Sequence, residues 1–294
     1  MVLTEHHIPI APSTFYAYQA RRFGPTMAEL EDAYAANTLH QLWGAHRGLY
    51  GQLKLWHAAR RAGYVWGRDR IARLMKILGI SGVVRGKHRI VTTTRNETAP
   101  RHSDHIKRAW DTPTGPDVWW VADFTYVWTL AGFCYVSFVT DVYSRRLLGW
   151  RVTTTKTTPL VLCALEQAIF TRRRTGFEFT AKGLVHHSDA GSQYTSLAFS
   201  EALIDAGIAG SIGSVGDALD NAMMESTIGL FKTEVIDRLT RSWTSWREVE
   251  KETASWVHWY NNGRVHSSIG YTTPAEYEHS YHKSTHRPRE PAAA

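Results

Sequence analysis

Three carboxylates are the side chains of this sequence whose type and placement could carry out chemistry. Asp123 lies inside the strand-like run 119–126, where a charged side chain costs desolvation energy unless it is paired or binds a cation. Asp189 follows a strand-like segment and precedes a glycine turn and a helix start, the edge at which open α/β sheets bind ligands. Glu225 lies on a helix predicted to begin near Ala218.

Each of these acids also has an ordinary structural explanation. Asp123 could be a strand residue on a solvated face, and Asp189 could cap a turn or a helix. Glu225 could be a solvated glutamate paired with a lysine. Considered together, the three acids can converge on one end of a sheet, where they would suit two Mg²⁺ ions about 3.5–4 Å apart that clamp a phosphoryl displacement.

The predicted helix after residue 218 also places other polar residues beside Glu225. Asn221, Glu225 and Lys232 fall at i, i+4 and i+11, which is one helix face because 11 residues are close to three turns. The opposite, buried side would consist of Met224, Ile228 and Phe231.

The elements that must position these acids follow from the hydrophobic pattern after residue 116. Three β-rich runs joined by short turns predict an antiparallel meander, and helices and two short strands then alternate. The order is βββ-α-β-α-β-α, which predicts a mixed α/β domain with one central sheet. The predicted strands are 118–128, 133–140, 147–153, 183–187 and 208–212, and the helices are 159–173, 195–206, 218–239 and 245–261.

The first 80 residues have a different character. Apolar residues recur at helical spacing over 27–40, 53–61 and 68–78, which is compatible with a small helix-turn-helix-like module. Arg70, Arg73 and Lys76 lie away from the apolar face and are candidates for DNA contact, although they could equally form a solvated basic face. Residues 81–116 hold no sustained apolar period and are predicted to be a basic linker.

The charge of the chain is concentrated in this region. Of the 294 residues, 34 are Lys or Arg and 27 Asp or Glu, which gives a formal net charge of +7. Residues 40–110 alone carry +12, whereas residues 111–294 carry −3. A polyanion such as DNA would therefore bind mainly through the basic segment, and the acidic remainder holds the proposed metal-binding carboxylates.

Other protein classes are disfavoured by composition. The two cysteines, Cys134 and Cys163, have no C-x-x-C spacing, so a disulfide framework or a cysteine-based zinc finger is excluded and a reducing interior is expected. No run of 18 apolar residues and no signal-peptide pattern is found. We therefore expect a soluble, cytoplasmic, nucleoid-associated protein without a membrane partner.

The motifs around the acids resemble a known family. Asp189 and Glu225 have 35 residues between them, and Lys232 follows seven residues after Glu225. With these spacings, residues 117–279 resemble the retroviral-integrase-type DDE core of bacterial insertion-sequence transposases, in the group encoded by a second, frameshifted reading frame. The segments that carry the resemblance are WVADFTY (120–126), TDVYSRR (140–146), HSDAGSQYTS (187–196), DNA (220–222), WYNN (259–262) and TPA (273–275). Residues 46–105 resemble the small helical module that precedes this core.

The resemblance implies an RNase H-like α/β fold with a mixed five-stranded sheet and flanking helices, preceded by the helix-turn-helix-like region. It implies metal and catalytic roles for Asp123, Asp189 and Glu225, dependence on Mg²⁺ or Mn²⁺ with two ions, and DNA cleavage and strand transfer at terminal inverted repeats. Lys232 and Asn221 are expected to contact DNA, as are Arg264 and His266, which follow the last core helix in a polar loop. We interpret Asp141 as structural, and His187 as either a packed strand-end residue or a contact to DNA or the metal site.

The expected organisation is a DNA-binding region at 1–80, a linker at 81–116, a catalytic core at 117–280 and a disordered tail at 281–294. The expected partners are double-stranded DNA, further copies of the chain and, because the upstream zipper region is absent from this sequence, the upstream-frame protein or a fusion with it. Two alternatives stay open at this point. One is a DNA-binding repressor or architectural protein with an inactive core, and the other is a nuclease of the same fold that does not transfer strands.

Overall fold

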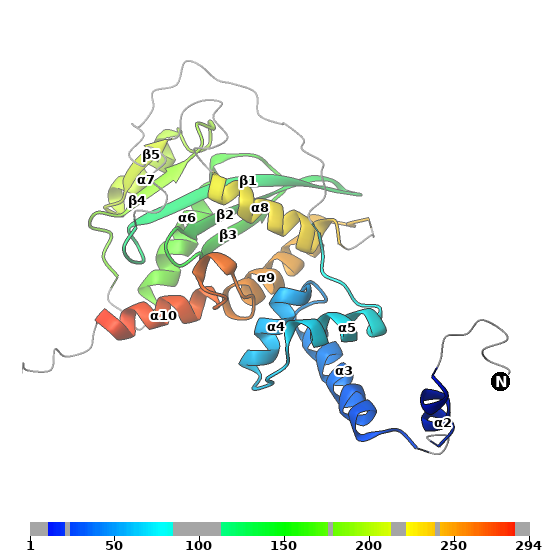
Figure 1. Ribbon diagram of the computed structural model, residues 1–294. Coiled ribbons are helices and arrows are strands. Elements are labelled where there is room, and N and C mark those ends of the chain that lie inside the picture. The colour runs from blue at the N-terminus through cyan, green and yellow to red at the C-terminus, as the bar shows by residue number, and fades with distance from the viewer. Residues whose placement is uncertain are drawn as a thin grey trace, which may run out of the picture. The chain divides into compact units, whose positions relative to one another are not determined.

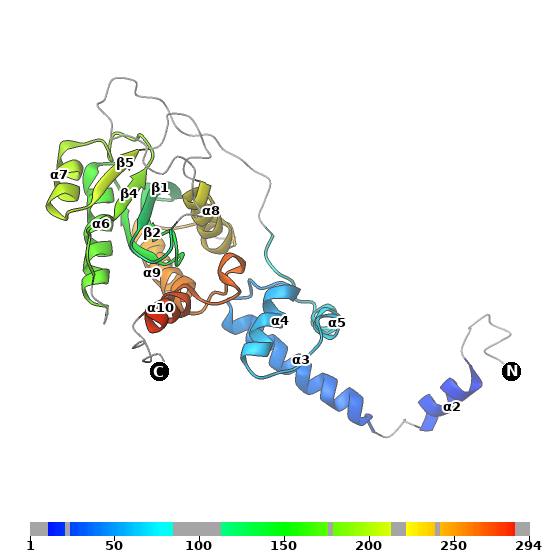
Figure 2. The ribbon, with the colours of Figure 1, turned by 60° about the vertical axis from the view of Figure 1, so that its left-hand side comes forward.

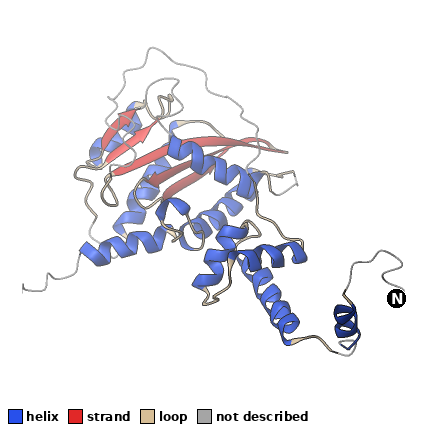
Figure 3. Cartoon of the chain, in the orientation of Figure 1, coloured by secondary structure: helices blue, strands red, loops and turns tan. Residues whose placement is uncertain are grey.

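The described residues form two compact units that divide between Val83 and Val84 (Figure 1). The structure is a computed structural model, and it describes residues 11–20, 24–84, 113–175, 179–212, 222–238 and 242–285. The first unit is helical, and the second combines a sheet with helices, as Figure 3 shows by colour.

Local sequence signals explain the helices of the first unit. Thr26 and Glu29 form a reciprocal capping box at the start of α3, in which each side chain accepts a hydrogen bond from the backbone N–H of the other. Gly79 ends α5 in the left-handed conformation, which glycine adopts without a steric cost. The helices are α2 (Pro12–Ala20), α3 (Met27–Ala45), α4 (Gln52–Arg61) and α5 (Arg68–Leu78).

The second unit is built on one five-stranded sheet in the order β3-β2-β1-β4-β5. β1, β2 and β3 are antiparallel neighbours, whereas β4 and β5 run parallel to β1. The strands are β1 (Trp119–Thr129), β2 (Gly132–Asp141), β3 (Leu147–Thr153), β4 (Val185–Ser188) and β5 (Ala209–Ile212). The helical elements are α6 (Thr158–Arg173), α7 (Leu197–Asp205), α8 (Ala222–Phe231), the π-helical turn η1 (Lys232–Ile236), α9 (Trp246–Asn262), the 3₁₀ turn η2 (Ser267–Ile269) and α10 (Pro274–Thr285).

Helices cover both faces of this sheet, and each face has its own hydrophobic core (Figure 2). On one face, Val121 and Phe138 pack against Trp256 of α9 and Phe231 of α8. On the other face, residues from α6 and α7 pack against the alternate positions of the same strands. The first part of the central strand β1 is therefore covered on both faces, which explains its three consecutive buried apolar residues, Trp120, Val121 and Ala122.

A close approach of backbones fixes α6 on the sheet and gives a testable consequence. A Cβ placed on Gly149 of β3 would lie 1.9 Å from the carbonyl oxygen of Ala164 and 2.9 Å from the amide nitrogen of Ala168. We expect Gly149→Ala to destabilise the protein by about 1–3 kcal/mol or more, because neither backbone atom can move without displacing α6. Thermal and urea unfolding measure the loss.

The matched control is Gly44→Ala in α3, where a new Cβ meets no atom within 4 Å. This substitution should leave stability unchanged or raise it by about 0.5–1 kcal/mol, because alanine favours the helix. Equal unfolding curves for Gly149→Ala and the unmodified protein would show that the contact between β3 and α6 is not tight.

The fold class predicted from the sequence is confirmed, including all five strands and their order along the chain. Two helices were missed. The C-terminal tail was predicted to begin at residue 281, but α10 extends to Thr285, so residues 281–285 are helical. The polar composition of α10 hides this helix, whose buried residues are Pro274 and Glu278, and α2 has no apolar stripe that would predict it. The predicted linker lies largely outside the described residues.

Within the described residues, no helix combines the length and the apolar character needed to cross a membrane.

Candidate active site

Asp123 and Asp189 are brought side by side by the parallel pairing of β1 and β4. Ala122 pairs with Ser188 at the last position of β4, and each aspartate is the residue that follows. Both side chains are half-buried. Each accepts a backbone hydrogen bond that orients it, Asp123 from the N–H of Phe124 at 2.7 Å and Asp189 from the N–H of Gly191 at 3.1 Å.

The electrostatics of the pair reflect this proximity. Burial raises the pKa of Asp123 well above its usual range, and the negative charges of Asp189 and Glu225 raise it further. Burial also raises the pKa of Asp189, which the hydrogen bond from Gly191 and the positive charge of Lys156 partly offset. The two aspartates are therefore held in an arrangement that disfavours their charged forms, which is common at functional sites.

Helix α8 runs along β1 and sets the position of Glu225. Met224 and Phe231 are fully buried and anchor the helix on the sheet. Glu225, exposed in the first turn, acts electrostatically on Asp123, while Lys232 donates a hydrogen bond to the carbonyl of Tyr126. The seven residues from Glu225 to Lys232 rise about 10.5 Å. The interval of three residues from Asp123 to Tyr126 spans about 10 Å along β1, so the distance between Glu225 and Lys232 along the helix matches the distance between Asp123 and Tyr126 along the strand.

Lys232 is half-buried, and its ammonium lies 4.9 Å from the centre of the Tyr126 ring. Burial lowers the pKa of Lys232. It is engaged with β1 in this structure, and the predicted DNA contact of Lys232 stays a prediction. Asn221, the other predicted contact on this helix, lies outside the described residues.

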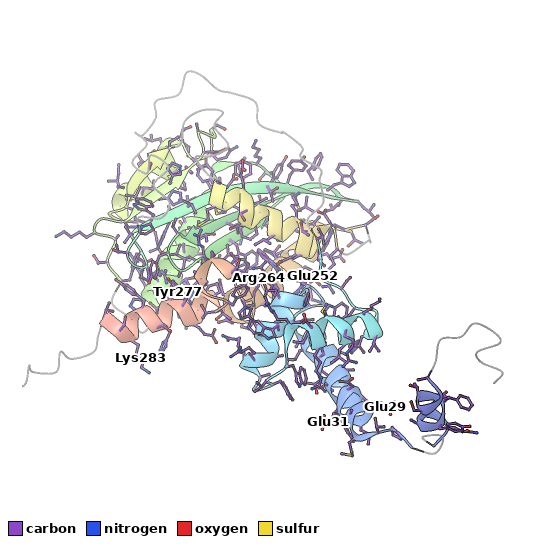
Figure 4. The ribbon with its side chains drawn as sticks, viewed as in Figure 1. Glu29, Glu31, Glu252, Arg264, Tyr277 and Lys283 are labelled. Carbon is purple, nitrogen blue, oxygen red and sulfur yellow. The ribbon has the colours of Figure 1, made fainter. Side chains whose placement is uncertain are left out.

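The structure places Arg264 and His266, two predicted DNA contacts, in the interior, where each residue is about 5% exposed. Arg264 forms an ion pair with Glu234 of η1 at 2.8 Å, and its other guanidinium nitrogen lies 3.2 Å from His266 Nδ1. Glu234 also accepts a hydrogen bond from the indole of Trp256. Figure 4 labels Arg264 amid the side chains of the core unit. The polar sequence suggested an exposed loop, but these polar groups satisfy one another in the interior and fix η1 onto α9.

A cation near the aspartates was not identified from the sequence. Lys156 lies in the threonine-rich loop after β3, exposed, with its ammonium 5.1 Å from the ring centre of Phe124. Its backbone carbonyl accepts a hydrogen bond from Gln193, four residues after Asp189. Lys156 therefore contacts both segments that carry the aspartates. No local spacing signals it, because it is distant from both aspartates in sequence.

The basic face predicted on the first unit is also modified by the structure. Asp32 of α3 forms ion pairs with Arg70 at 3.0 Å and with Arg73 at 2.6 Å, which lower its pKa. The first part of α3 further exposes Glu29 and Glu31 (Figure 4). Of the three predicted DNA contacts in α5, two are thus paired with a carboxylate, and Lys76 is exposed. Periodicity located the cations on the helix, but it could not show the acid on the neighbouring helix.

Two further residues near the site have structural contacts. Asp141 is fully buried and accepts hydrogen bonds from Asp117 N and from the backbone and side chain of Ser144, in keeping with the structural role expected for it. His187 is a packed strand-end residue, and its Nδ1 lies 2.9 Å from Ser211 Oγ.

The three candidate donors are carboxylates, whose oxygens hard divalent cations prefer. Across the described residues, no three His, Cys, Asp or Glu side chains form a complete metal-binding group. The aspartate pair is therefore the organised part of the site, and Glu225 approaches it from the start of α8.

Comparison with known proteins agrees with the fold. Two models of the integrase core domain match residues 113–218 and 206–274, and a model of an HTH-like domain matches residues 29–88. The core models cover the sheet and the segments that hold all three acids. The fold and the models thus define a protein with an integrase core and a helix-turn-helix-like domain.

Relatives specify the class further. The chain is 43% identical over 278 residues to the transposase for insertion sequence element IS629 of Shigella sonnei, covering 94% of this chain and 90% of the relative. It is 45% identical over 281 residues to a proposed transposase of element IS986/IS6110 of Mycobacterium tuberculosis, covering 96% of this chain and 99% of the relative. Among solved structures, the catalytic core domain of BIV integrase matches with a TM-score of 0.43 and 19% identity, covering 58% of this chain and 99% of that one. The chain belongs to the insertion-sequence transposases that have an integrase core domain.

Proposed function

We propose that this transposase cleaves DNA at the terminal inverted repeats of an insertion sequence and transfers the resulting strand ends, with Asp123, Asp189 and Glu225 as its catalytic residues. The observation that supports this most is the pairing of β1 with β4, which sets two half-buried aspartates side by side with raised pKa values. Glu225 acts on Asp123 from the adjacent helix.

The donor set fits a hard divalent cation, Mg²⁺ or Mn²⁺. Repulsion between ionised Asp123 and Asp189 is the kind of strain that such a cation relieves, and Glu225 is the third donor that we propose. Asp123, Asp189 and Glu225 would hold such ions, which would supply Lewis-acid activation of the attacking water or 3′-hydroxyl and charge stabilisation of the leaving oxygen.

The residues of the chain itself have separate tasks in this proposal. Gly191 and Phe124 orient the two carboxylates through their backbone N–H groups. Lys156 provides positive charge beside the acids and would hold a DNA phosphate there, since its loop is tied to Gln193. Asp123 and Asp189 must be ionised to act, so activity should rise with pH through their raised pKa values.

The test is cleavage and strand transfer of a labelled duplex that carries the inverted repeats flanking the gene. The unmodified protein should form nicked and joined products with Mg²⁺ and none with EDTA, and Asp189→Asn should form neither. Full activity of Asp189→Asn would refute the site assignment. Nicked without joined products would indicate the nuclease alternative, and metal-independent binding alone would indicate the repressor.

The remaining expectations about assembly follow from this reaction. We propose that residues 1–80 bind DNA, that 81–116 connect them to the core at 117–280, and that more than one copy acts, because two element ends must be joined. The substrate is the DNA of the bacterial nucleoid, which places the reaction in the cytoplasm. An upstream-frame protein, separate or fused, is a further proposed partner.

A further inference from the structure

The helical unit carries two arginines that share one tryptophan. Trp56 of α4 is half-buried, and the guanidinium carbons of Arg60 and Arg68 lie 5.0 and 6.0 Å from the centre of its ring. Arg60 comes from the last turn of α4 and Arg68 from the first residue of α5. Two positive charges that are well separated along the chain are thus gathered on one corner of the unit.

The corner is rigid because hydrogen bonds tie its elements together. The indole N–H of Trp56 donates to the carbonyl of Trp66 at 3.0 Å, and Gln52 donates to the carbonyl of Arg68 at 3.0 Å. Tyr64 stacks on Trp66 with ring centres 4.5 Å apart, which orders the connection between the two helices. The arginines are therefore presented from a fixed surface.

These arginines differ from Arg70 and Arg73 of the same unit by lacking an acidic partner among the described residues. Among the described residues, Arg60 and Arg68 are both exposed and form no ion pair, whereas Arg70 and Arg73 pair with Asp32. A cation at a helix N-terminus, where Arg68 lies, opposes the helix dipole. A residue placed unfavourably for local structure, as Arg68 is, commonly has a functional role such as ligand binding.

We propose that Arg60, Trp56 and Arg68 form a binding site for the phosphate backbone of double-stranded DNA. The two guanidinium groups lie no more than about 11 Å apart, the sum of their distances to the shared ring. Each DNA strand carries one phosphate per about 3.4 Å of rise, so two or three phosphates fall within their reach. The planar guanidinium can bind a phosphate through two N–H groups while its face stays over the indole.

The proposal deepens the proposed function, because it identifies the surface by which the helical unit holds DNA. It is an alternative to the DNA-contacting face predicted from Arg70 and Arg73, which share the single carboxylate of Asp32. The site is independent of sequence readout, so it should bind a mixed-sequence duplex.

The experiment measures binding of the full chain to a fluorescent mixed-sequence duplex in EDTA, at several salt concentrations. Arg60→Gln and Arg68→Gln should each lower affinity and reduce the slope of log K against log salt by about one. Arg60→Lys and Arg68→Lys should keep most of the slope, because they keep the charge. Arg174→Gln is the matched control, since Arg174 is also exposed over an aromatic ring, that of Phe170 at 5.3 Å.

Arg73→Gln tests the competing surface in the same assay. A reduced slope for Arg73→Gln with unchanged slopes for Arg60→Gln and Arg68→Gln would overturn the proposal. Because EDTA prevents cleavage, the binding measurement is independent of the proposed catalytic function. If the protein cleaves DNA but Arg60→Gln and Arg68→Gln leave the salt slopes unchanged, only the binding site is refuted. Full cleavage activity of Asp189→Asn would refute the proposed catalytic site and leave the binding result unchanged.

Discussion

Asp123→Asn should abolish metal-dependent cleavage and, at the same time, raise the melting temperature of the protein at pH 8. Activity should fall by on the order of 10³-fold or more, since the substitution removes a charged donor from the reacting centre. Stability should rise because Asp123 is half-buried and faces the negative charges of Asp189 and Glu225. The amide has nearly the same shape and carries no charge.

The direction of the pH effect follows from the raised pKa. Between the unfolded and folded pKa values, the folded state binds more protons, so stability is lost as pH rises through the folded pKa. The gain from Asn should therefore be present at pH 8, be small near pH 4 and vanish at still lower pH, where Asp123 is protonated in both the folded and the unfolded state. Mg²⁺ should stabilise the unmodified protein and have less effect on the variant.

Thermal melts at the two pH values, with and without Mg²⁺, measure both effects. Asp205→Asn is the matched control, because Asp205 is exposed at the end of α7. A variant that is inactive but destabilised at pH 8 would contradict the electrostatic explanation, and one that is active would contradict the site.

The second large effect is expected at Arg172, the buried centre of an ionic network. Its guanidinium forms ion pairs with Asp117 at 2.7 Å and with Glu278 at 2.5 Å, and it lies 3.6 Å from Asp141. Arg172→Met should lower the free energy of unfolding by about 3–5 kcal/mol, because it leaves buried carboxylates without their cation. For a unit of this size, the melting temperature should fall by on the order of 10 °C.

This loss should diminish in acid. Arg172 and Arg146 hold the pKa of Glu278 below its usual value, so Glu278 contributes stability above its unfolded pKa that is lost as pH falls through the folded pKa. Burial raises the pKa of Asp141 to about 6 even with Arg172 present. Without Arg172 both groups take up protons more readily, so the difference between the proteins should be largest near pH 7 and smallest near pH 4.

The control is Arg174→Met, which changes an exposed arginine two residues further on and should alter stability by no more than about 0.5 kcal/mol. Equal effects of Arg172→Met and Arg174→Met would show that the network contributes nothing. A constant difference between pH 4 and pH 7 would show that its contribution is not ionic.

The sheet was predictable because its signals are local. β-branched and aromatic runs interrupted by short turns identify β1 to β3, and Asp123 stands out within such a run. The positions of Asp123, Asp189 and Glu225 relative to the elements were predictable in the same way, as strand, strand end and helix, although the helix was predicted to begin near Ala218 and α8 begins at Ala222. The electrostatic interaction between Asp123 and Asp189 depends on the parallel pairing of β1 with β4. This pairing cannot be derived from the positions of the two residues in the sequence.

The polar residues outside the strands were harder to predict because their partners are distant in sequence. Arg264 resembles an exposed loop residue until Glu234, 30 residues earlier, is placed against it. Arg70 and Arg73 resemble free cations until Asp32 is placed opposite them. In both cases composition indicated charge correctly, and only tertiary structure showed which acidic side chain pairs with it.

Because equal lengths of α8 and β1 separate their functional groups, the helix fixes the distance between Glu225 and Lys232 relative to Asp123 and Tyr126 of β1. One residue inserted between Glu225 and Lys232 would turn the glutamate by about 100° and shift it by about 1.5 Å relative to the lysine. Lys232 is held at Tyr126, so the displacement would fall on Glu225 and move it away from Asp123. The fold therefore constrains the interval from Glu225 to Lys232 to seven residues. Insertions outside this interval should reduce activity less than insertions within it.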